Sequence, residues 1–552
     1  MRREVLKVDI SELTPGVHFV GRREALLWIG DDGSVRAALN RCRHQGGRFG
    51  PPEGCRVRCP WHGWELDVSR MTYTNPTGGT PQPELIVERR GDELTLFEEV
   101  LDAPWQAEPR PLEPLGPGEL DVTYFTHACL RVRAGRFVLF TDPWLEGPAF
   151  TRGWWLSHAP PEGSFAELAR ADLIYISHNH SDHLNPATLR RLSTLNADVP
   201  IIVPELDSGD ITHWVRRYGM RNVRAVPFDR WLELGPRLRV MALRDGTAPG
   251  DSGLLTEYAG HRILNAVDCS DLNGGILPEG VDLYMSSFSR GASGFPVCWS
   301  ELLDRESIEA WIAKDTAHIV RRVCDAVVRT RPRAYLPIAS YFVEAHPADA
   351  EIRRVNTKTS ARELCEAVRR ATPEPLTFEP RPGDCLDLCD LSLRRGPEPR
   401  PPAWNFAHYL APVEACRHFA PLDDPEGLLA YFRWSGYRGD LILHVIETDD
   451  TFTPCGQRWL VDLSGPQLLA ARPSTPHRYL RLKVRGDVFR HTLRHGLPWD
   501  EISIGFNARL YREPNAYNRD FWSHFQNCLP ATPPWAEPVA AQRTDRRCAS
   551  TI

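Results

Sequence analysis

The sequence has few lysines and no long apolar run. Of its 66 basic residues only Lys7, Lys314, Lys358 and Lys483 are lysines, and its richness in Arg, Ala and Pro indicates a high-GC bacterial gene. No apolar stretch approaches the roughly 20 residues that a membrane-spanning helix needs. Residues 1–7 contain no apolar leader segment. These absences predict a cytoplasmic protein.

The sequence also lacks a strong charge of either sign. Its formal net charge is −6, with both signs interspersed, so no basic stripe of the kind that binds nucleic acid is present. We therefore expect neither nucleic acid nor a membrane as partner. The 14 cysteines should be mostly reduced thiols in the cytoplasm. Cys385 and Cys389 have no second pair nearby to complete a zinc site, and Cys55 is expected to be an ordinary thiol.

The length of 552 residues is sufficient for about three or four domains. Proline-rich passages at 103–117 and 373–402 divide the chain at plausible places. The last part before the tail mixes strand-like runs with aromatic residues, which predicts a folded α+β module. The expected domains are residues 1–102, 118–372 and 404–529, followed by a disordered tail at 530–552.

Two short motifs near the amino terminus predict an iron–sulfur site. Cys42 and His44 belong to Cys-Arg-His-Gln-Gly-Gly, and Cys59 and His62 belong to Cys-Pro-Trp-His-Gly-Trp. In a Rieske [2Fe–2S] cluster, two thiolates bind one iron and two imidazoles bind the other. A structural zinc site uses the same residue types, but the paired arms and their Gly-rich loops favour the Rieske cluster. This segment is therefore expected to carry single electrons.

The two extra cysteines that join the cluster loops of high-potential Rieske proteins are missing. Gly47 and Trp61 stand near the places of those cysteines. The segment therefore resembles the lower-potential Rieske domains of oxygenases and their ferredoxins. The usual catalytic region of such oxygenases, with its Asp-x-x-His-x-x-x-x-His run, is not found after the cluster motifs. The electrons need another acceptor within the chain.

A second motif supplies this acceptor. An apolar run at 173–176 predicts a buried strand, and Asn185-Pro186 predicts the start of a helix through an N-cap and a proline in the first turn. The loop between them contains His178, His180, Asp182 and His183. A solvated histidine-rich loop would need neither the aspartate at this spacing nor the apolar strand before it. We therefore predict a metal site on this loop.

The pattern His-x-His-x-Asp-His resembles the metallo-β-lactamase superfamily, whose αββα sandwich binds one or two metals at the edge of its sheets. Residues 129–142 and 253–268 share a plan of strand, Ala-Gly turn, apolar strand and aspartate, as expected of matching hairpins in the two halves. The resemblance implies that Asp142 supports the site, that Asp268 is a bridging or second-metal ligand, and that His346 is the final ligand.

One histidine that the superfamily supplies to the first metal between residues 200 and 260 is missing. His213 lies there on a predicted helical segment, too early to fit, and Asp245 or Asp251 could take its place. By the same resemblance His127 could lie near the site. Carboxylate and imidazole ligands suit non-haem iron as well as zinc. Because zinc has no use for electrons, we expect one or two iron ions here.

The whole chain is similar to the CMP-N-acetylneuraminate hydroxylase family, monooxygenases that convert N-acetyl to N-glycolyl on a nucleotide-linked sialic acid. The stretches that carry this similarity are 124–129, 265–269, 291–299, 341–347, 496–506 and 512–514. The resemblance implies a multidomain fold with an N-terminal all-β Rieske domain, a central αββα metallo-β-lactamase-like sandwich and a C-terminal α+β module. It also implies O2 as co-substrate and a ferredoxin or cytochrome b5-type donor with its reductase.

The leading hypothesis is a Rieske-fed non-haem iron oxygenase that hydroxylates carbon or oxidises nitrogen. Its substrate would be a nucleotide sugar, an amino sugar or a natural-product intermediate, and a homo-oligomer could let the cluster of one chain serve the metal of another. A lactonase or phosphodiesterase with zinc or manganese and a regulatory Rieske domain would use only the second motif. An electron carrier or redox sensor would use only the first. The predicted catalytic residues are His178, His180, Asp182, His183, Asp268 and His346.

Overall fold

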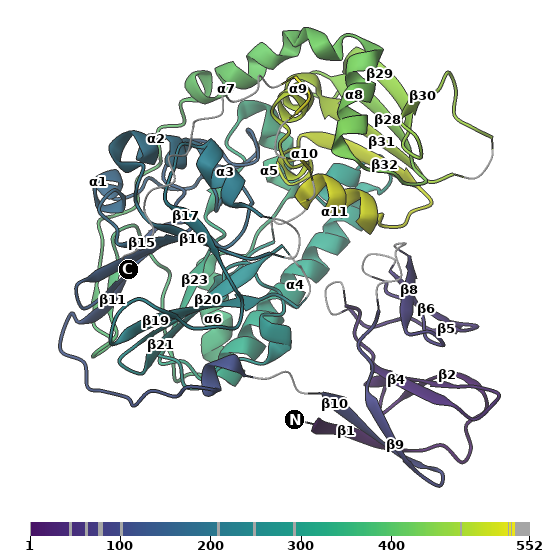
Figure 1. Cartoon of the computed structure of the whole chain (residues 1–552), viewed down its shortest axis with the longest axis horizontal. Helices are drawn as coiled ribbons and strands as arrows, with labels where there is room; N and C mark the ends of the chain where they lie inside the picture. The colour runs from purple at the N-terminus through teal and green to yellow at the C-terminus, as the bar shows by residue number, and fades with distance from the viewer. Residues whose placement is uncertain are drawn as a thin grey trace, which may run out of the picture.

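The computed structural model describes residues 2–43, 47–60, 64–75, 81–99, 103–206, 210–246, 250–290, 294–474, 477–527, 529–530 and 533–535. The predicted cluster ligands His44 and His62, and residues 536–552 of the predicted tail, lie outside the described residues. Figure 1 shows three parts: an amino-terminal domain in purple, a central domain from blue to teal, and a carboxy-terminal module from green to yellow.

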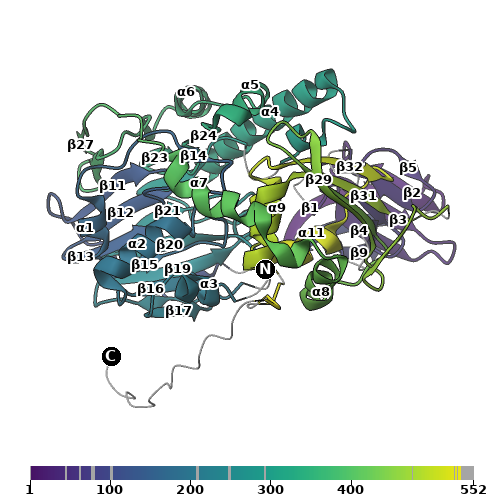
Figure 2. The same ribbon diagram turned by 90° about the horizontal axis from the view of Figure 1, so that it is seen from above.

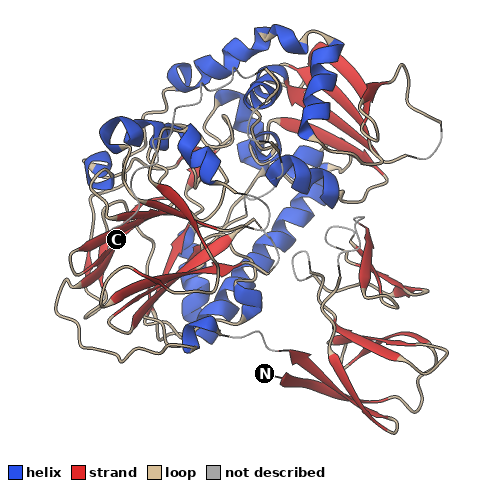
Figure 3. Ribbon diagram, in the orientation of Figure 1, coloured by secondary structure: helices blue, strands red, loops and turns tan. Residues whose placement is uncertain are grey.

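Strands alone make up the described amino-terminal domain (Figure 3). Two three-stranded sheets, ordered β1-β10-β9 and β2-β3-β4, enclose a core that includes Leu27 and Leu94. The four-stranded sheet β5-β6-β7-β8 carries the loop with Cys59, and Cys42 lies just before it. The strands are β1 (Arg2–Asp9), β2 (Gly16–Val20), β3 (Ala25–Ile29), β4 (Val35–Leu39), β5 (Pro52–Glu53), β6 (Arg56–Arg58), β7 (Glu65–Asp67), β8 (Thr72–Asn75), β9 (Ile86–Arg90) and β10 (Glu93–Glu99).

Two mixed sheets form the centre of the second domain, and one buried core that includes Leu139 and Leu283 joins them. The predicted hairpins are present, because Leu130 pairs with Thr141 in one sheet and Leu254 pairs with Asn265 in the other. The first sheet, in spatial order, is β17 (Val223–Val226), β16 (Ile201–Pro204), β15 (Leu173–Tyr175), β13 (Phe137–Thr141), β12 (Cys129–Ala134), β11 (Leu120–Thr126), β26 (Cys385–Asp387) and β27 (Leu393–Arg394). The second is β18 (Leu232–Glu233), β19 (Leu238–Arg244), β20 (Ser252–Tyr258), β21 (His261–Asn265), β22 (Leu283–Ser287), β23 (Ala334–Ile338) and β25 (Leu376–Thr377). Strands β14 (Trp155–Leu156) and β24 (Phe342–Val343) form a separate pair.

Helices cover the outer faces of both sheets, which completes the expected αββα sandwich (Figure 2). The long helix α4 and its neighbour α6 pack on the second sheet, while α3 packs beside β17 of the first. The helices are α1 (Ser164–Leu168), α2 (Pro186–Asn196), α3 (Thr212–Arg217), α4 (Arg305–Thr330), α5 (Ala350–Val355) and α6 (Ala361–Ala371). Short 3-10 helices are η1 (Pro104–Gln106), η2 (Asn273–Gly275), η3 (Val297–Trp299) and η4 (Pro347–Asp349).

The second proline-rich passage belongs partly to this sandwich. Strands β25, β26 and β27 lie beyond residue 372, the expected end of the domain, and they extend both sheets. Strand β26 pairs with β11 through Asp121 and Asp387. These strands are only two or three residues long, so the prolines stand between them and interrupt no ladder. A boundary drawn on proline content therefore cuts the domain too early.

The carboxy-terminal module is an α+β fold, as expected. Its sheet has the order β30-β29-β28-β31-β32, with β28 and β31 parallel. The elements are α7 (Phe406–Glu414), η5 (Ala415–His418), η6 (Ala420–Leu422), α8 (Pro425–Ser435), β28 (Ile442–Thr448), β29 (Pro454–Asp462), β30 (Gln467–Leu468), β31 (Tyr479–Arg485), α9 (Gly486–His495), α10 (Asp500–Ser503), β32 (Ala508–Glu513) and α11 (Arg519–Asn527).

The central domain and the carboxy-terminal module share a hydrophobic core. Phe150 of the central domain and Trp499 of the module are fully buried in the same cluster. The two backbones touch, since a Cβ added to Gly153 would lie 2.2 Å from the carbonyl oxygen of Gly505. The module is therefore fixed against the edge of the sandwich that carries the His-x-His-x-Asp-His loop. None of the described helices is both long and apolar enough to cross a lipid bilayer.

Candidate metal centre

The His-x-His-x-Asp-His loop joins β15 to α2, as the sequence predicts. Asn185 caps the helix, because its Oδ1 accepts a hydrogen bond of 2.9 Å from the backbone N–H of Thr188. Its Nδ2 donates to the carbonyl oxygen of Ser181 within the loop, at 2.9 Å. The capping residue thus holds the loop and starts the helix at the same time.

The first group of metal-binding side chains consists of His178, His180 and Asp251. Their donor atoms all lie within 4.8 Å of one another. Nε2 of His178 is 2.8 Å from Nδ1 of His180 and 3.9 Å from Oδ1 of Asp251. Of the two aspartates that the sequence left open, Asp251 lies in this group. Asp245 does not, since its carboxylate accepts hydrogen bonds from the backbone of Ser270 and Asp271.

The second group consists of His127, Asp182 and His183, which are all buried. Nε2 of His127 is 3.0 Å from Oδ2 of Asp182, and Nε2 of His183 is 3.5 Å from the same oxygen. Asp268 lies between the two groups. Its Oδ2 is 3.3 Å from Nε2 of His183, and it forms a third set of donors with His178 and His183.

Several donor atoms in these groups have no hydrogen-bond partner. Oδ1 of Asp182, Oδ1 of Asp268, Nδ1 of His127 and Nε2 of His183 are all buried and unpaired. Such atoms are costly unless something satisfies them. Imidazole nitrogens and carboxylate oxygens at this spacing are ligands for a divalent or trivalent first-row metal. The residues therefore fit the non-haem iron that the sequence predicts.

Hydrogen bonds behind the ligands fix their orientation. Asp142 accepts from the backbone N–H of Ser177 at 2.7 Å and from its hydroxyl at 2.9 Å. Its Oδ2 lies 3.1 Å from Nδ1 of His183, so Nε2 of that ring faces the site. The Ser177 hydroxyl also lies 2.8 Å from Nδ1 of His178, which turns the other nitrogen of this ring inward in the same way.

Three residues at the metal centre have strained backbone conformations. His127, Asp142 and Val267, the neighbour of Asp268, have φ angles of 41°, 38° and 48°. Side chains other than glycine rarely adopt this left-handed region, and a fold keeps such residues there only where the surroundings enforce it. All three positions deliver a ligand or its support at the end of a strand, where the chain turns sharply toward the site.

Burial also changes the acid–base properties of the site. It lowers the pKa of His178 to about 4, which favours the neutral imidazole that binds metals. Burial raises the pKa of Asp251 to about 7. These pKa shifts describe the side chains without a bound metal. The positive charge of a metal would favour the carboxylate form of Asp251.

The carboxy-terminal module contributes two acids that sequence reasoning missed. Oδ2 of Asp500 lies 3.7 Å from Nε2 of His180, and Oε2 of Glu501 accepts a hydrogen bond of 2.9 Å from the Thr151 hydroxyl. Burial raises the pKa of Asp500 to about 6 and that of Glu501 to about 7. Both residues stand at the start of the short helix α10, far along the chain from the loop, so no local pattern connects them with it.

His346 is not brought into any of these groups. Its Nδ1 lies 2.8 Å from Nη2 of Arg152 and accepts from the backbone N–H of Ala348. Its ring packs edge-on against Phe406 of the carboxy-terminal module. The Arg152 guanidinium therefore engages Nδ1 of this ring. The other five residues predicted for this centre do come together, and His127 and Asp251 join them.

The described part of the iron–sulfur site is consistent with the predicted cluster. Cys42 and Cys59 are both 2% exposed and belong to one buried core. Two matched backbone hydrogen bonds of 2.7 Å close the loops, from Cys42 to Gly47 and from Cys59 to Trp64. Both cysteines therefore lie in one buried core, and each has its backbone N–H hydrogen-bonded to a residue of its own motif.

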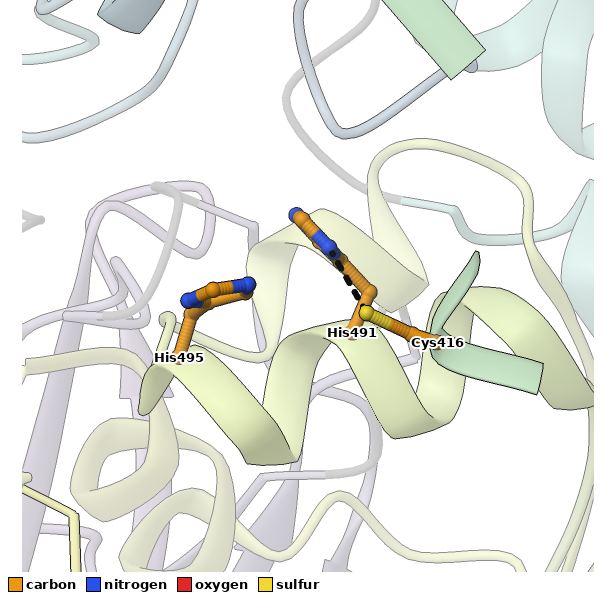
Figure 4. A group of neighbouring side chains, drawn as sticks. All are labelled: Cys416, His491 and His495. Atoms are coloured by element: carbon orange, nitrogen blue, oxygen red, sulfur yellow. Dashed lines mark hydrogen bonds between the residues drawn. The ribbon is translucent and has the colours of Figure 1, made fainter. Parts of the chain in front are cut away.

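A further group, Cys416, His491 and His495, lies in the carboxy-terminal module (Figure 4). Sγ of Cys416 is 3.5 Å from Nδ1 of His491, and the two histidines are one helical turn apart on α9. Nη1 of Arg494 lies 3.9 Å from the same sulfur. The pKa of His491 is lowered to about 3, by burial and by the positive charges of neighbouring histidine and arginine side chains. This positive charge opposes a cation, so we assign no metal here.

Comparisons with known proteins agree with the site and the fold. Residues 5–82 match the Rieske [2Fe-2S] domain family, and residues 121–240 match the beta-lactamase superfamily domain. Together with the paired histidine and carboxylate groups, these matches define a Rieske-dependent non-haem iron oxygenase. The cytidine monophosphate-N-acetylneuraminic acid hydroxylase of Danio rerio is 39% identical over 553 residues, covering 95% of this chain and 93% of that protein. Its Mus musculus counterpart is 39% identical over 552 residues, covering 95% of each chain.

The chain belongs to the CMP-N-acetylneuraminic acid hydroxylase family, which confirms the predicted family, fold class and monooxygenase activity. Among solved structures, the diiron β-hydroxylase CmlA from Streptomyces venezuelae is a partial match. It is 20% identical, with a TM-score of 0.33, over 49% of this chain and 54% of that one.

Proposed function

We propose that this protein hydroxylates the N-acetyl methyl group of CMP-N-acetylneuraminic acid. The observation that carries this proposal is the 39% identity, over 95% of the chain, to relatives named for that substrate. In the balanced reaction, one oxygen atom of O2 enters the C–H bond of the methyl group and the other leaves as water, with two protons and two electrons from an external donor. When bound, the Rieske cluster supplies single electrons and non-haem iron activates O2.

The proposed ligands form two adjacent sets. His178, His180 and Asp251 hold one iron, His127, Asp182 and His183 hold the other, and Asp268 stands between them. The close grouping of their donor atoms supports this set of seven. His346 is left outside it, because its Nδ1 is engaged by Arg152.

A metal count tests this ligand set. Replacement His127→Ala should reduce the iron of the second domain, whereas His346→Ala should leave it unchanged. Iron per chain, measured in protein purified without oxygen, is the readout, and the cluster's electron paramagnetic resonance signal serves as internal standard. Loss of iron in the His346→Ala protein with full iron in His127→Ala would reverse the assignment.

The substrate is tested with reductant, O2 and CMP-N-acetylneuraminic acid, and the product is identified by mass spectrometry. We expect a hydroxylated CMP-sugar, with UDP-N-acetylglucosamine and free N-acetylneuraminic acid unchanged under the same conditions. Hydroxylation of UDP-N-acetylglucosamine alone would show that the chain has another substrate. The Cys42→Ser protein is the matched control, because it should lose the cluster and with it the turnover.

We further propose that the enzyme works in the cytoplasm. Its electron donor would be a ferredoxin or a cytochrome b5-type protein with its reductase. Either carrier, added in its reduced form to the oxidised protein, should bleach the visible absorbance of the cluster. A donor that reduces the cluster without supporting product formation would not be the physiological one.

A further inference from the structure

The iron–sulfur domain contacts the carboxy-terminal module beside its own cluster loops. The ring of Trp64 lies parallel to that of Tyr517, with centroids 6.5 Å apart and an angle of 18° between the planes. The guanidinium of Arg519 lies 5.6 Å from the centroid of the Trp64 ring. Tyr517 packs against the buried core that contains Cys42 and Cys59. Figure 1 shows the corresponding arrangement, with β8 directed toward α11.

A second contact lies on the other arm of the cluster motif. Nη2 of Arg41, the residue before Cys42, lies 2.6 Å from Oδ1 of Asp271 in the central domain. Asp271 follows the proposed ligand Asp268 by three residues. An ion pair that is partly exposed adds little stability, but its position is informative. Both cluster motifs therefore contact other domains of the same chain, one through Trp64 and the other through Arg41.

The contact of Trp64 continues inward to the metal centre. Helix α11 begins at Arg519, two residues after Tyr517, and carries Gln526 near its other end. Oδ1 of Asp500 accepts a hydrogen bond of 2.6 Å from Gln526, and its Oδ2 lies 3.7 Å from His180. Residues 500–526 of the module thus contact both the core that contains the cluster cysteines and the proposed ligand His180.

We propose that electrons pass within one chain, from the cluster across the contact of Trp64 with Tyr517 to Asp500 and His180. This proposal depends on the ligand set given above, but not on the identity of the substrate. Each passage oxidises the cluster by one electron and reduces one ferric ion of the second domain to ferrous, and the external donor restores the cluster. The carboxy-terminal module is then the bridge that brings the two redox sites together, and Tyr517 is a positioning residue.

Electron transfer without turnover provides the first test. In oxygen-free protein with a ferric second site, a light pulse on an added photosensitiser with a sacrificial electron donor reduces the cluster, and the absorbance of the cluster is followed as it is reoxidised. We expect a first-order recovery whose rate does not depend on protein concentration. Tyr517→Leu should slow it at least tenfold, while Tyr517→Phe, which keeps the ring, should keep the rate. Tyr511→Leu, in the same module but away from the contact, is the matched control.

The cluster's electron paramagnetic resonance spectrum must be unchanged in each variant, so that a slower rate reflects the path and not damage to the cluster. An unchanged rate of recovery in Tyr517→Leu would overturn the proposed route.

If Tyr517→Leu fails to fold, a mixing experiment decides whether electrons pass within one chain. The Cys42→Ser chain lacks the cluster and the His183→Ala chain lacks a complete metal centre, so a mixture, co-expressed in one cell, should remain inactive. Recovery of hydroxylation in the mixture would mean that electrons cross between chains, and would refute the proposal.

Discussion

Replacement of Asp142 by asparagine should weaken metal binding although Asp142 is not a ligand. Its two oxygens face three donors, namely the N–H and hydroxyl of Ser177 and Nδ1 of His183. An amide has only one acceptor oxygen. If the NH2 group faces His183, the ring must carry its proton on Nε2 and loses the lone pair that binds metal. If the NH2 group faces the N–H of Ser177, two donors oppose each other in a buried place, at a cost of about 1–3 kcal/mol.

Loss of a hydrogen-bond partner behind a ligand typically lowers metal affinity by about 10–100-fold, which corresponds to about 1.4–2.8 kcal/mol. The assay is competition with a chelator, read as iron retained beyond that of the cluster. Asp282 provides the control, because its Oδ1 lies 3.0 Å from Nδ1 of His261 in a similar contact. This contact involves none of the proposed ligands. Asp282→Asn should retain full iron. Equal retention in Asp142→Asn would refute the argument that this aspartate orients His183.

Three other perturbations have defined outcomes. Burial lowers the pKa of His158 from its ordinary 6.5 to about 4, so the folded protein prefers the neutral ring. The contribution of the neutral ring to the free energy of unfolding is complete above pH 6.5 and falls by up to about 3 kcal/mol toward pH 4. The His158→Gln protein should therefore lose less unfolding free energy, measured in urea, between pH 7 and pH 5. An equally steep decline in this variant would argue against the role of His158. Arg485→Met leaves the Asp349 carboxylate buried without its ion-pair partner and should lower the free energy of unfolding by about 3–5 kcal/mol. A loss below about 1 kcal/mol would contradict this prediction. Cys42→Ser should abolish turnover while iron analysis still finds the second-domain iron; residual turnover would mean that electrons bypass the cluster.

Local signals in the sequence were sufficient for much of the fold. The helix start at Asn185 and Pro186 was predictable because capping and proline geometry act within one turn. The hairpins that end near Asp142 and Asp268 were predictable because a strand, a tight turn and a second strand form a contiguous pattern. The two cluster motifs were recognisable for the same reason, since each ligand pair lies within a few residues.

Contacts between distant segments could not be predicted in this way. The sequence offered both Asp245 and Asp251, and only the tertiary structure separates them, because Asp245 is engaged by the backbone after Asp268. The resemblance implied His346 as a ligand, but in the folded chain Nδ1 of His346 lies 2.8 Å from Nη2 of Arg152. Asp500 reaches His180 only because the carboxy-terminal module shares a core with the central domain. Such a contact depends on tertiary packing, which a periodic pattern in the sequence does not indicate.

We propose that O2, with electrons delivered through the cluster, oxidises a CMP-sugar at the metal site of the second domain. The most direct test is turnover of CMP-N-acetylneuraminic acid under isotopically heavy O2, with product mass and electrons consumed measured together. We expect one heavy oxygen atom in each product molecule, two electrons for each product, and no product from the Cys42→Ser protein. A product whose new oxygen comes from water, or one that forms without a reductant, would contradict it.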